Sequence, residues 1–133
     1  MASALRGVSA EVEDAHGVSV DVVTVGDGDY VEALRPVVAA TREAVTNAAK
    51  HAGVPRVDVY AEITDGAVDV FVRDRGRGFD PALTPEDRYG VRRSIIDRMQ
   101  RHGGTGDIRS TLGEGTEVHL HLPRPADQEG DDE

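Results

Sequence analysis

Residues 42–51, with the sequence REAVTNAAKH, contain side chains that can hold a metal ion beside a phosphate group. On a helix, Glu43, Asn47 and Lys50 fall at i, i+4 and i+7 and share one stripe. His51 lies beside that stripe. A carboxylate, an amide and a cation in this order suit a divalent cation and phosphate oxygens. The same stripe also fits an ordinary solvated helix face, and this segment alone does not separate the two interpretations.

Residues 74–79, with the sequence DRGRGF, place a carboxylate where the backbone must turn. The alternating valines of residues 68–72 predict a strand that leads into Asp74. Gly76 and Gly78 allow positive φ angles or a close approach of the backbone to a ligand. Asp followed by Gly-x-Gly is also typical of a plain turn, so this motif too has a purely structural alternative.

The stripe of Glu43, Asn47 and Lys50 requires a helix, which we expect over residues 35–52. Pro36 stands at the first helical position, where its missing N–H costs nothing. Gly53 supplies a stop signal and Pro55 follows it. Apolar positions at helical spacing predict one buried face, formed by Val37, Val38, Thr41, Ala44, Val45, Ala48 and Ala49.

A third group of residues follows in the last third of the chain. It begins with Tyr89, Gly90 and Val91, continues through a helical pattern to Gly103-Gly104, and ends with the turn GEGT at residues 113–116. We expect the helix to span residues 89–101 and residues 80–88, which contain two prolines, to form a mobile loop.

Together the three groups resemble the nucleotide-binding site of the GHKL ATPase superfamily. They are most similar to the catalytic ATP-binding domain of bacterial sensor histidine kinases in the nitrate-sensor and lipid-fluidity-sensor subgroup. The pattern ExxxNxxKH resembles the N box of that family, and DxGxGF resembles its first glycine box. The third group resembles the end of the ATP lid, a helix and a closing hairpin. The resemblance covers residues 18–124, and the three motifs occur in the family's order.

The resemblance implies ATP and Mg²⁺ as ligands. The amide oxygen of Asn47 would bind Mg²⁺, which prefers oxygen ligands and keeps several waters. Lys50 and His51 would meet phosphate oxygens about one helical turn further on. Glu43 would be the catalytic residue, although its role stays open: the N-box glutamate of hydrolytic relatives orients or deprotonates a water, whereas a kinase transfers phosphate to a histidine.

Adenine recognition would fall to Asp74, whose carboxylate can accept a hydrogen bond from the exocyclic amino group. Guanine presents a carbonyl at that edge, so this contact would select ATP over GTP. In the family a threonine hydroxyl joins the contact, and Thr116 is the match; β-strand propensity alone also explains a threonine there. Gly76 and Gly78 would let the backbone pass beside the nucleotide.

The far end of the lid would lie at Tyr89, Gly90 and Val91. Gly90 matches a family glycine at which backbone N–H groups can face phosphate. Two departures from the family pattern stand here: the lid is short, and Gly90 is single where many kinases carry a Gly-x-Gly pair.

Composition limits the function classes. The 133 residues contain no cysteine, which excludes disulfides and thiolate metal sites. A net charge of −10 argues against a general nucleic-acid binder. The sequence shows neither an apolar run of membrane-spanning length nor a signal peptide. We therefore expect no membrane contact by this segment. The resemblance implies a cytoplasmic location, either of the whole protein or as the cytoplasmic part of a membrane-bound sensor. His119 and His121 alternate on a strand, which we interpret as one face of a sheet.

The expected fold is a two-layer α/β sandwich, in which a mixed, mostly antiparallel sheet of about five strands carries helices on one face. This agrees with the Bergerat fold that the resemblance implies. We expect strands at residues 17–25, 56–63, 67–73, 107–111 and 116–122. Residues 1–16 would end a connecting segment, residues 17–124 would form the ATP-binding domain, and residues 125–133 would be a disordered acidic tail.

Three functions remain open from the sequence. The first is the catalytic domain of a sensor histidine kinase, which would bind Mg-ATP and pass the γ-phosphate to a histidine on a dimerisation domain, and thence to a response regulator. The second is an anti-sigma-factor-type serine kinase with the same fold. The third is a nucleotide-binding or interaction module without catalysis. No acceptor histidine on a long helix is recognisable in this sequence.

Overall fold

The computed structural model describes residues 2–26, 32–51, 56–76, 86–111 and 113–123; within these ranges the side chains of residues 2, 51, 86–92 and 111 lie outside the description. The elements, in chain order, are α1 (Ala2–His16), β1 (Ser19–Val25), a 3-10 turn (Glu32–Leu34), α2 (Arg35–His51), β2 (Arg56–Ile63), β3 (Ala67–Asp74), α3 (Glu86–Arg101), β4 (Thr105–Thr111) and β5 (Gly115–Pro123).

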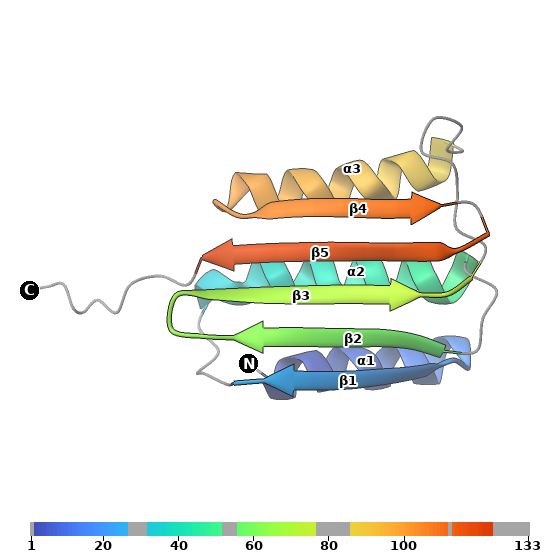
Figure 1. Cartoon of the computed structure of the whole chain (residues 1–133), viewed down its shortest axis with the longest axis horizontal. Helices are drawn as coiled ribbons and strands as arrows, with labels where there is room; N and C mark the ends of the chain where they lie inside the picture. Colours follow the sequence, from blue (N-terminus) through green and yellow to red (C-terminus); the bar gives the residue numbers. More distant parts are fainter. Residues whose placement is uncertain (1, 27–31, 52–55, 77–85, 112, 124–133) are drawn as a thin grey trace, which may run out of the picture.

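The five strands form one sheet in the order β1-β2-β3-β5-β4 (Figure 1). β1 and β2 pair in parallel, because the chain crosses over through α2 between them, and all other neighbours are antiparallel. The three helices cover one face of the sheet. The expected two-layer sandwich with a mixed, mostly antiparallel sheet of five strands is therefore confirmed.

The core lies between the sheet and the helices. Strand residues alternate in burial, so the valines at 68, 70 and 72 of β3 face the helices, and their exposure is 2 % or less. On α2 the expected apolar face is buried: Val37 and Val45 have no exposed surface, and Thr41 donates its hydroxyl to the carbonyl oxygen of Val37. This face fixes the rotation of α2 and so turns Glu43 and Asn47 away from the core.

Helix α1 belongs to this core. Leu5, Val8 and Val12 recur at helical spacing and are each exposed by 3 % or less. The helix packs against α2 and β1. Whether residues 1–16 also end a connecting segment, as expected, stays a prediction, but in this structure they cover the sheet beside β1.

The start of α3 differs from expectation. The helix begins at Glu86, so residues 86–88 are helical where a loop was predicted, while the remainder of that segment, residues 80–85, lies outside the described residues. Glu86 and Asp87 place negative charge in the first helical turn, which favours a helix start without any apolar periodicity. β4 likewise begins two residues before its predicted start.

The end of α3 is held by two glycines. Gly103 adopts a φ of 86° and donates its N–H to Gln100, and the N–H of Gly104 donates to the carbonyl oxygen of Met99. A Cβ on Gly104 would collide with the carbonyl oxygen of His121. These contacts place the last turn of α3 directly against β5.

Candidate functional site

Two of the predicted site residues are opposed at one end of the sheet, and the helix that carries a third reaches the same end. β3 ends at Asp74, β5 begins one residue before Thr116, and α2 reaches the same end with Asn47 near its C-terminus (Figure 1). Asp74 and Thr116 are directly opposed in the antiparallel register of β3 and β5. The fold therefore places the two residues expected to contact adenine on neighbouring strands.

Asp74 is a buried carboxylate, with 7 % of its surface exposed. It continues the alternation of β3, in which the even-numbered residues face the helices. Its Oδ1 accepts a hydrogen bond of 2.9 Å from the N–H of Gly76, which closes the turn that follows the strand. The first glycine of the DxGxGF motif thus helps to orient the carboxylate, while Gly78 lies outside the described residues.

Thr116 is held by Ser110 on the adjacent strand. The two hydroxyl oxygens are 2.8 Å apart, and the Ser110 hydroxyl also lies 3.1 Å from the carbonyl oxygen of Gly115, to which it donates. A Ser110 proton directed at Gly115 leaves Thr116 as the donor in the hydroxyl pair, so the lone pairs of Thr116 can accept. Ser110 was missed in the sequence, because its approach to Thr116 depends on the pairing of β4 with β5.

Gly115 was also missed as a structural requirement of this site. Its φ is 102°, and a Cβ there would collide with the carbonyl oxygen of Asp74 and lie 2.9 Å from the Cα of Arg75. Only glycine fits this conformation and this spacing. A cavity of about 460 Å³ opens here, lined by Arg73, Asp74, Arg75, Arg109, Gly113, Glu114, Gly115, Thr116 and Glu117.

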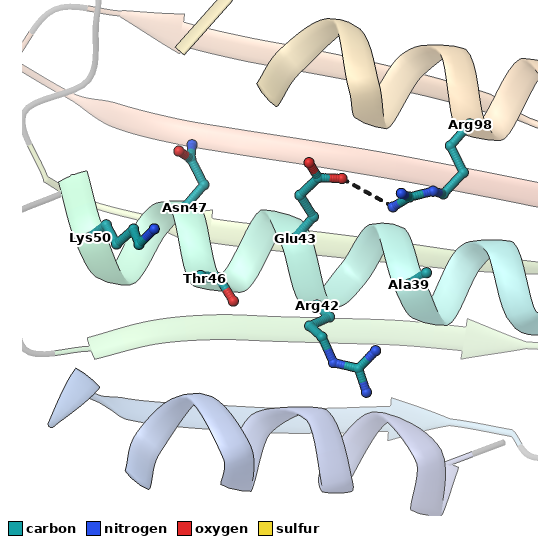
Figure 2. A pocket seen from close by; sticks show the side chains of 7 residues that line it. All are labelled: Ala39, Arg42, Glu43, Thr46, Asn47, Lys50 and Arg98. Carbon is teal, nitrogen blue, oxygen red and sulfur yellow. Dashed lines mark hydrogen bonds and ion pairs between the residues drawn. The ribbon is translucent and has the colours of Figure 1, made fainter. Parts of the chain in front are cut away.

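The polar stripe of α2 lines a second cavity of about 460 Å³, formed by Ala39, Arg42, Glu43, Thr46, Asn47, Lys50 and Arg98. Figure 2 shows the side chains of Glu43 and Asn47 directed toward α3, whereas Arg42 points toward α1. Asn47 is half-buried and Lys50 is exposed. The predicted stripe of carboxylate, amide and cation is therefore present and faces a cavity.

Glu43 is bound by α3. Its Oε1 lies 3.0 Å from Nη1 of Arg98 and accepts a weaker hydrogen bond of 3.4 Å from the hydroxyl of Ser94. The side chains of Glu43 and Arg98 are 28 % and 32 % exposed, so the pair is partly shielded from water. Neither Ser94 nor Arg98 was predicted to belong to the site.

The remaining predicted residues divide as follows. Asn47 and Asp74 line different cavities among the described residues. Gly90 lies within the first turns of α3. The side chains of His51, Tyr89 and Val91 lie outside the description.

Helices α2 and α3 carry a local excess of positive charge. α2 contains three basic residues and one acidic residue, and α3 contains five basic and three acidic residues. The whole chain has 15 basic and 25 acidic side chains. Among the described side chains that line the second cavity, three are basic and one is acidic, and such a field favours an anionic ligand.

The opposite face of the sheet carries a separate polar cluster. Asp69 Oδ1 lies 2.9 Å from Nε2 of His119 and 2.8 Å from Nδ1 of His121. Burial raises the pKa of Asp69, but the hydrogen bonds from the two histidines outweigh it, so the net pKa lies below its ordinary value. The two histidines share one sheet face, as expected. Within the described ranges, His, Cys, Asp and Glu form no cluster of three or more arranged to hold a metal ion.

Among the helices that the structure describes, none is long and apolar enough to cross a membrane.

A family model for histidine kinase-, DNA gyrase B- and HSP90-like ATPases matches residues 32–126. Among curated proteins, the chain is 27 % identical over 92 residues to the sensor histidine kinase LiaS of Bacillus subtilis, which is 69 % of this chain and 25 % of LiaS. It is 36 % identical over 87 residues to an uncharacterised sensor-like histidine kinase of Chloroflexus aurantiacus, which is 62 % of this chain and 15 % of that protein. The chain thus spans a quarter or less of the length of these relatives.

Solved structures share the fold. The ATP-binding domain of PrrB from Mycobacterium tuberculosis aligns with a TM-score of 0.72 at 22 % identity, over 94 % of each chain. The histidine kinase domain of a blue-light-activated kinase from Erythrobacter litoralis aligns with a TM-score of 0.66 at 21 % identity, over 90 % of this chain and 58 % of that one. The matching architecture extends over nearly the whole sequence.

Proposed function

Because the chain belongs to the family of histidine kinase-, DNA gyrase B- and HSP90-like ATPases, we propose that it binds Mg-ATP as the catalytic domain of a two-component sensor histidine kinase. In this function it donates the γ-phosphate to a histidine on a dimerisation domain, which lies elsewhere in the same full-length protein or in another chain. The phosphate then passes to a response regulator. The domain works in the cytoplasm, where ATP is available.

The observation that carries this proposal is the pairing of Asp74 with Thr116 at the sheet end reached by the Asn47 stripe. A carboxylate has several lone pairs and can accept more than one hydrogen bond. The exocyclic amino group of adenine is a donor from which this carboxylate can accept, and the Thr116 hydroxyl, whose proton is directed at Ser110, can accept beside it. The turn made by Gly76 holds the carboxylate in place from the backbone side.

The second part of the proposal concerns Mg²⁺ and the phosphates. The donor chemistry of the α2 stripe fits Mg²⁺: Asn47 offers an amide oxygen, and Glu43 one turn away offers a carboxylate able to hold metal-bound water. When bound, Mg²⁺ would neutralise phosphate charge. Lys50 contributes a mobile positive charge for phosphate oxygens. His51 and the first turns of α3, with Tyr89, Gly90 and Val91, complete the phosphate end of the proposed site.

Transfer of the γ-phosphoryl group demands little covalent chemistry from the protein, because positioning and charge stabilisation dominate catalysis of this reaction. The positive charge of Lys50, which lines the second cavity, supplies part of that stabilisation. Glu43 acts on the acceptor side, as the group that positions a proton acceptor or metal-bound water. The acceptor histidine itself comes from the dimerisation domain.

The phosphate half of the proposal is tested with Asn47→Ala and the matched control Thr46→Ala. Thr46 lines the same cavity one position earlier on the helix, but its side chain points away from α3 in Figure 2. Calorimetric titration should show that Asn47→Ala weakens Mg-ATP binding at least tenfold, since a metal ligand is lost. Thr46→Ala should bind as the wild type does.

The acceptor is tested by incubating the chain and radiolabelled ATP with a histidine-bearing dimerisation domain from a related kinase. Transfer of label in an acid-labile form supports a histidine kinase. Transfer in an acid-stable form to a serine-bearing partner would instead identify a serine kinase. Mg-ATP binding without transfer to either partner would contradict the kinase assignment.

A further inference from the structure

Helices α2 and α3 face each other through two polar stripes. On α2, Glu43 and Asn47 are separated by four residues and lie on one side of the helix. On α3, Ser94 and Arg98 have the same separation. Figure 2 shows the carboxylate of Glu43 and the guanidinium of Arg98 directed toward one another across the gap between the helices.

The contacts converge on a single oxygen of Glu43. Both the Arg98 guanidinium, at 3.0 Å, and the Ser94 hydroxyl, at 3.4 Å, approach Oε1. Among the residues that the structure describes, these two side chains are the polar partners of that carboxylate. A carboxylate held from one side through one oxygen has a fixed orientation.

The contact also sets the position of α3 along α2. The two helices run in opposite directions in Figure 1. One turn after Glu43 on α2 comes Asn47, and one turn before Ser94 on α3 comes Gly90. The turn of α3 that contains Gly90 therefore lies toward the Asn47 end of α2, and a slip of α3 by one turn would require the Arg98 pair to break.

We propose that Arg98 is a positioning residue of the nucleotide site: its ion pair with Glu43 fixes α3 against α2, so that the first turns of α3 and the Asn47 stripe bind the phosphates of one nucleotide together. This inference rests on the proposed function. It assigns Arg98 a role through Glu43 and the α3 register, and no contact with the nucleotide.

A matched control exists on the other side of the same helix. Arg42 forms an ion pair of 3.1 Å with Glu11 and so joins α2 to α1, which carries no residue of the proposed site. Its side chain is 51 % exposed, compared with 32 % for Arg98. Arg42→Ala thus removes one interhelical Arg–Glu pair and leaves the contact between α2 and α3 unchanged.

The test is calorimetric titration of the full chain with Mg-ATP and, separately, with adenosine. Four variants are compared with the wild type: Arg98→Ala, Arg98→Lys, Glu43→Gln and Arg42→Ala. Arg98→Ala should weaken Mg-ATP binding about tenfold, the size of a typical coupling between sites. Its adenosine affinity should be unchanged, because Asp74 and Thr116 lie on the strands. Arg98→Lys should recover most of the loss, and Glu43→Gln should weaken Mg-ATP binding by a factor similar to that of Arg98→Ala. Arg42→Ala should keep its adenosine affinity and lose much less Mg-ATP affinity than Arg98→Ala, because Arg42 lines the cavity but its guanidinium is paired with Glu11 of α1.

Thermal unfolding without ligand separates positioning from general stability. Arg98→Ala and Arg42→Ala should lower the unfolding midpoint by similar small amounts, since each loses one partly exposed ion pair. The double variant Glu43→Gln/Arg98→Ala should bind Mg-ATP no more weakly than the weaker single variant, because both substitutions remove the same pair.

The outcomes distinguish the two proposals. Unchanged Mg-ATP affinity in Arg98→Ala, with a wild type that binds, overturns the positioning role alone. Tighter Mg-ATP binding in Arg98→Ala also overturns it, since Arg98 would then restrain Glu43 from the nucleotide. A wild type that binds neither Mg-ATP nor adenosine overturns the proposed function, and the positioning role with it.

Discussion

Asp74 and Thr116 are opposed across β3 and β5, and Gly115 next to Thr116 lies so close to the Asp74 carbonyl that no side chain fits there. This relationship joins a buried carboxylate, a hydroxyl and a backbone turn at one end of the sheet. The packing of this corner and the proposed recognition of adenine therefore depend on the same few atoms. The packing of the corner and the recognition of adenine can each be perturbed by a separate substitution.

Thr116→Val keeps the β-branched shape of the side chain and removes only the hydroxyl. If Thr116 contacts the nucleotide, Mg-ATP binding should weaken about fivefold, the effect of losing one hydrogen bond of about 1 kcal/mol. Thr105→Val, on an exposed position of β4, is the matched control and should bind as the wild type does. Calorimetric titration measures both, and equal affinities for the two variants would remove Thr116 from the site.

Gly115→Ala should destabilise the fold strongly, because the new Cβ collides with the Asp74 carbonyl and the residue keeps a φ of 102°. We expect a loss of about 2–4 kcal/mol in the free energy of unfolding. Gly113→Ala is the control: its φ is 85°, but a Cβ there meets open space, so only the backbone strain of about 1 kcal/mol applies. Urea unfolding measures the free energy of unfolding of the two variants. Equal values would mean that β3 and β5 are not in close contact at Gly115.

The cluster of Asp69 with His119 and His121 should make stability depend on pH. The pKa of Asp69 is lowered in the folded state, so its contribution is complete above the unfolded pKa of about 3.9 and is lost as the pH falls through the lower folded value. The difference in unfolding free energy between wild type and Asp69→Asn should therefore be larger at pH 5 than at pH 2.5. Asp107→Asn, which removes a more exposed pair with Arg109, should show a smaller change over the same interval.

Helix α1 should contribute to the stability of the domain. Val8→Ala removes a side chain that is 2 % exposed, and we expect a loss of about 1–3 kcal/mol. Val23→Ala makes the same substitution at a position that is 56 % exposed and should change stability by less than about 0.5 kcal/mol. Chemical unfolding of both variants decides the matter. Equal free energies of unfolding for Val8→Ala and Val23→Ala would mean that α1 is not packed on the domain in solution.

Local patterns were sufficient to predict α2, its buried face and the Asp74 turn. The spacing of Val37 and Val45 determines which side of α2 is buried, and that side determines where Asn47 points. The alternation of β3 likewise carries Asp74 to the inner face. These features depend on residues within one or two turns of each other, which is the range over which periodicity is informative.

The contacts of the site were not predictable in the same way. Ser110 meets Thr116 because β4 and β5 pair in one register, and Arg98 meets Glu43 because α3 lies beside α2. Both depend on the order of elements in space, which no local pattern specifies. The start of α3 at Glu86 was missed for a different reason: charge at a helix terminus favours it without any apolar repeat.

The most direct test of the central claim is calorimetric titration of the wild type and Asp74→Asn with Mg-ATP and Mg-GTP. Asparagine keeps the size of the side chain and can still accept from Gly76, but it removes the charge and adds a donor. The wild type should bind Mg-ATP and discriminate against Mg-GTP. Asp74→Asn should bind Mg-ATP about 10–100-fold more weakly, because a charged hydrogen bond contributes about 1.5–3 kcal/mol, and should discriminate less. Unchanged ATP affinity in Asp74→Asn, or a wild type that binds both nucleotides equally, would contradict the assignment of this corner as the adenine site.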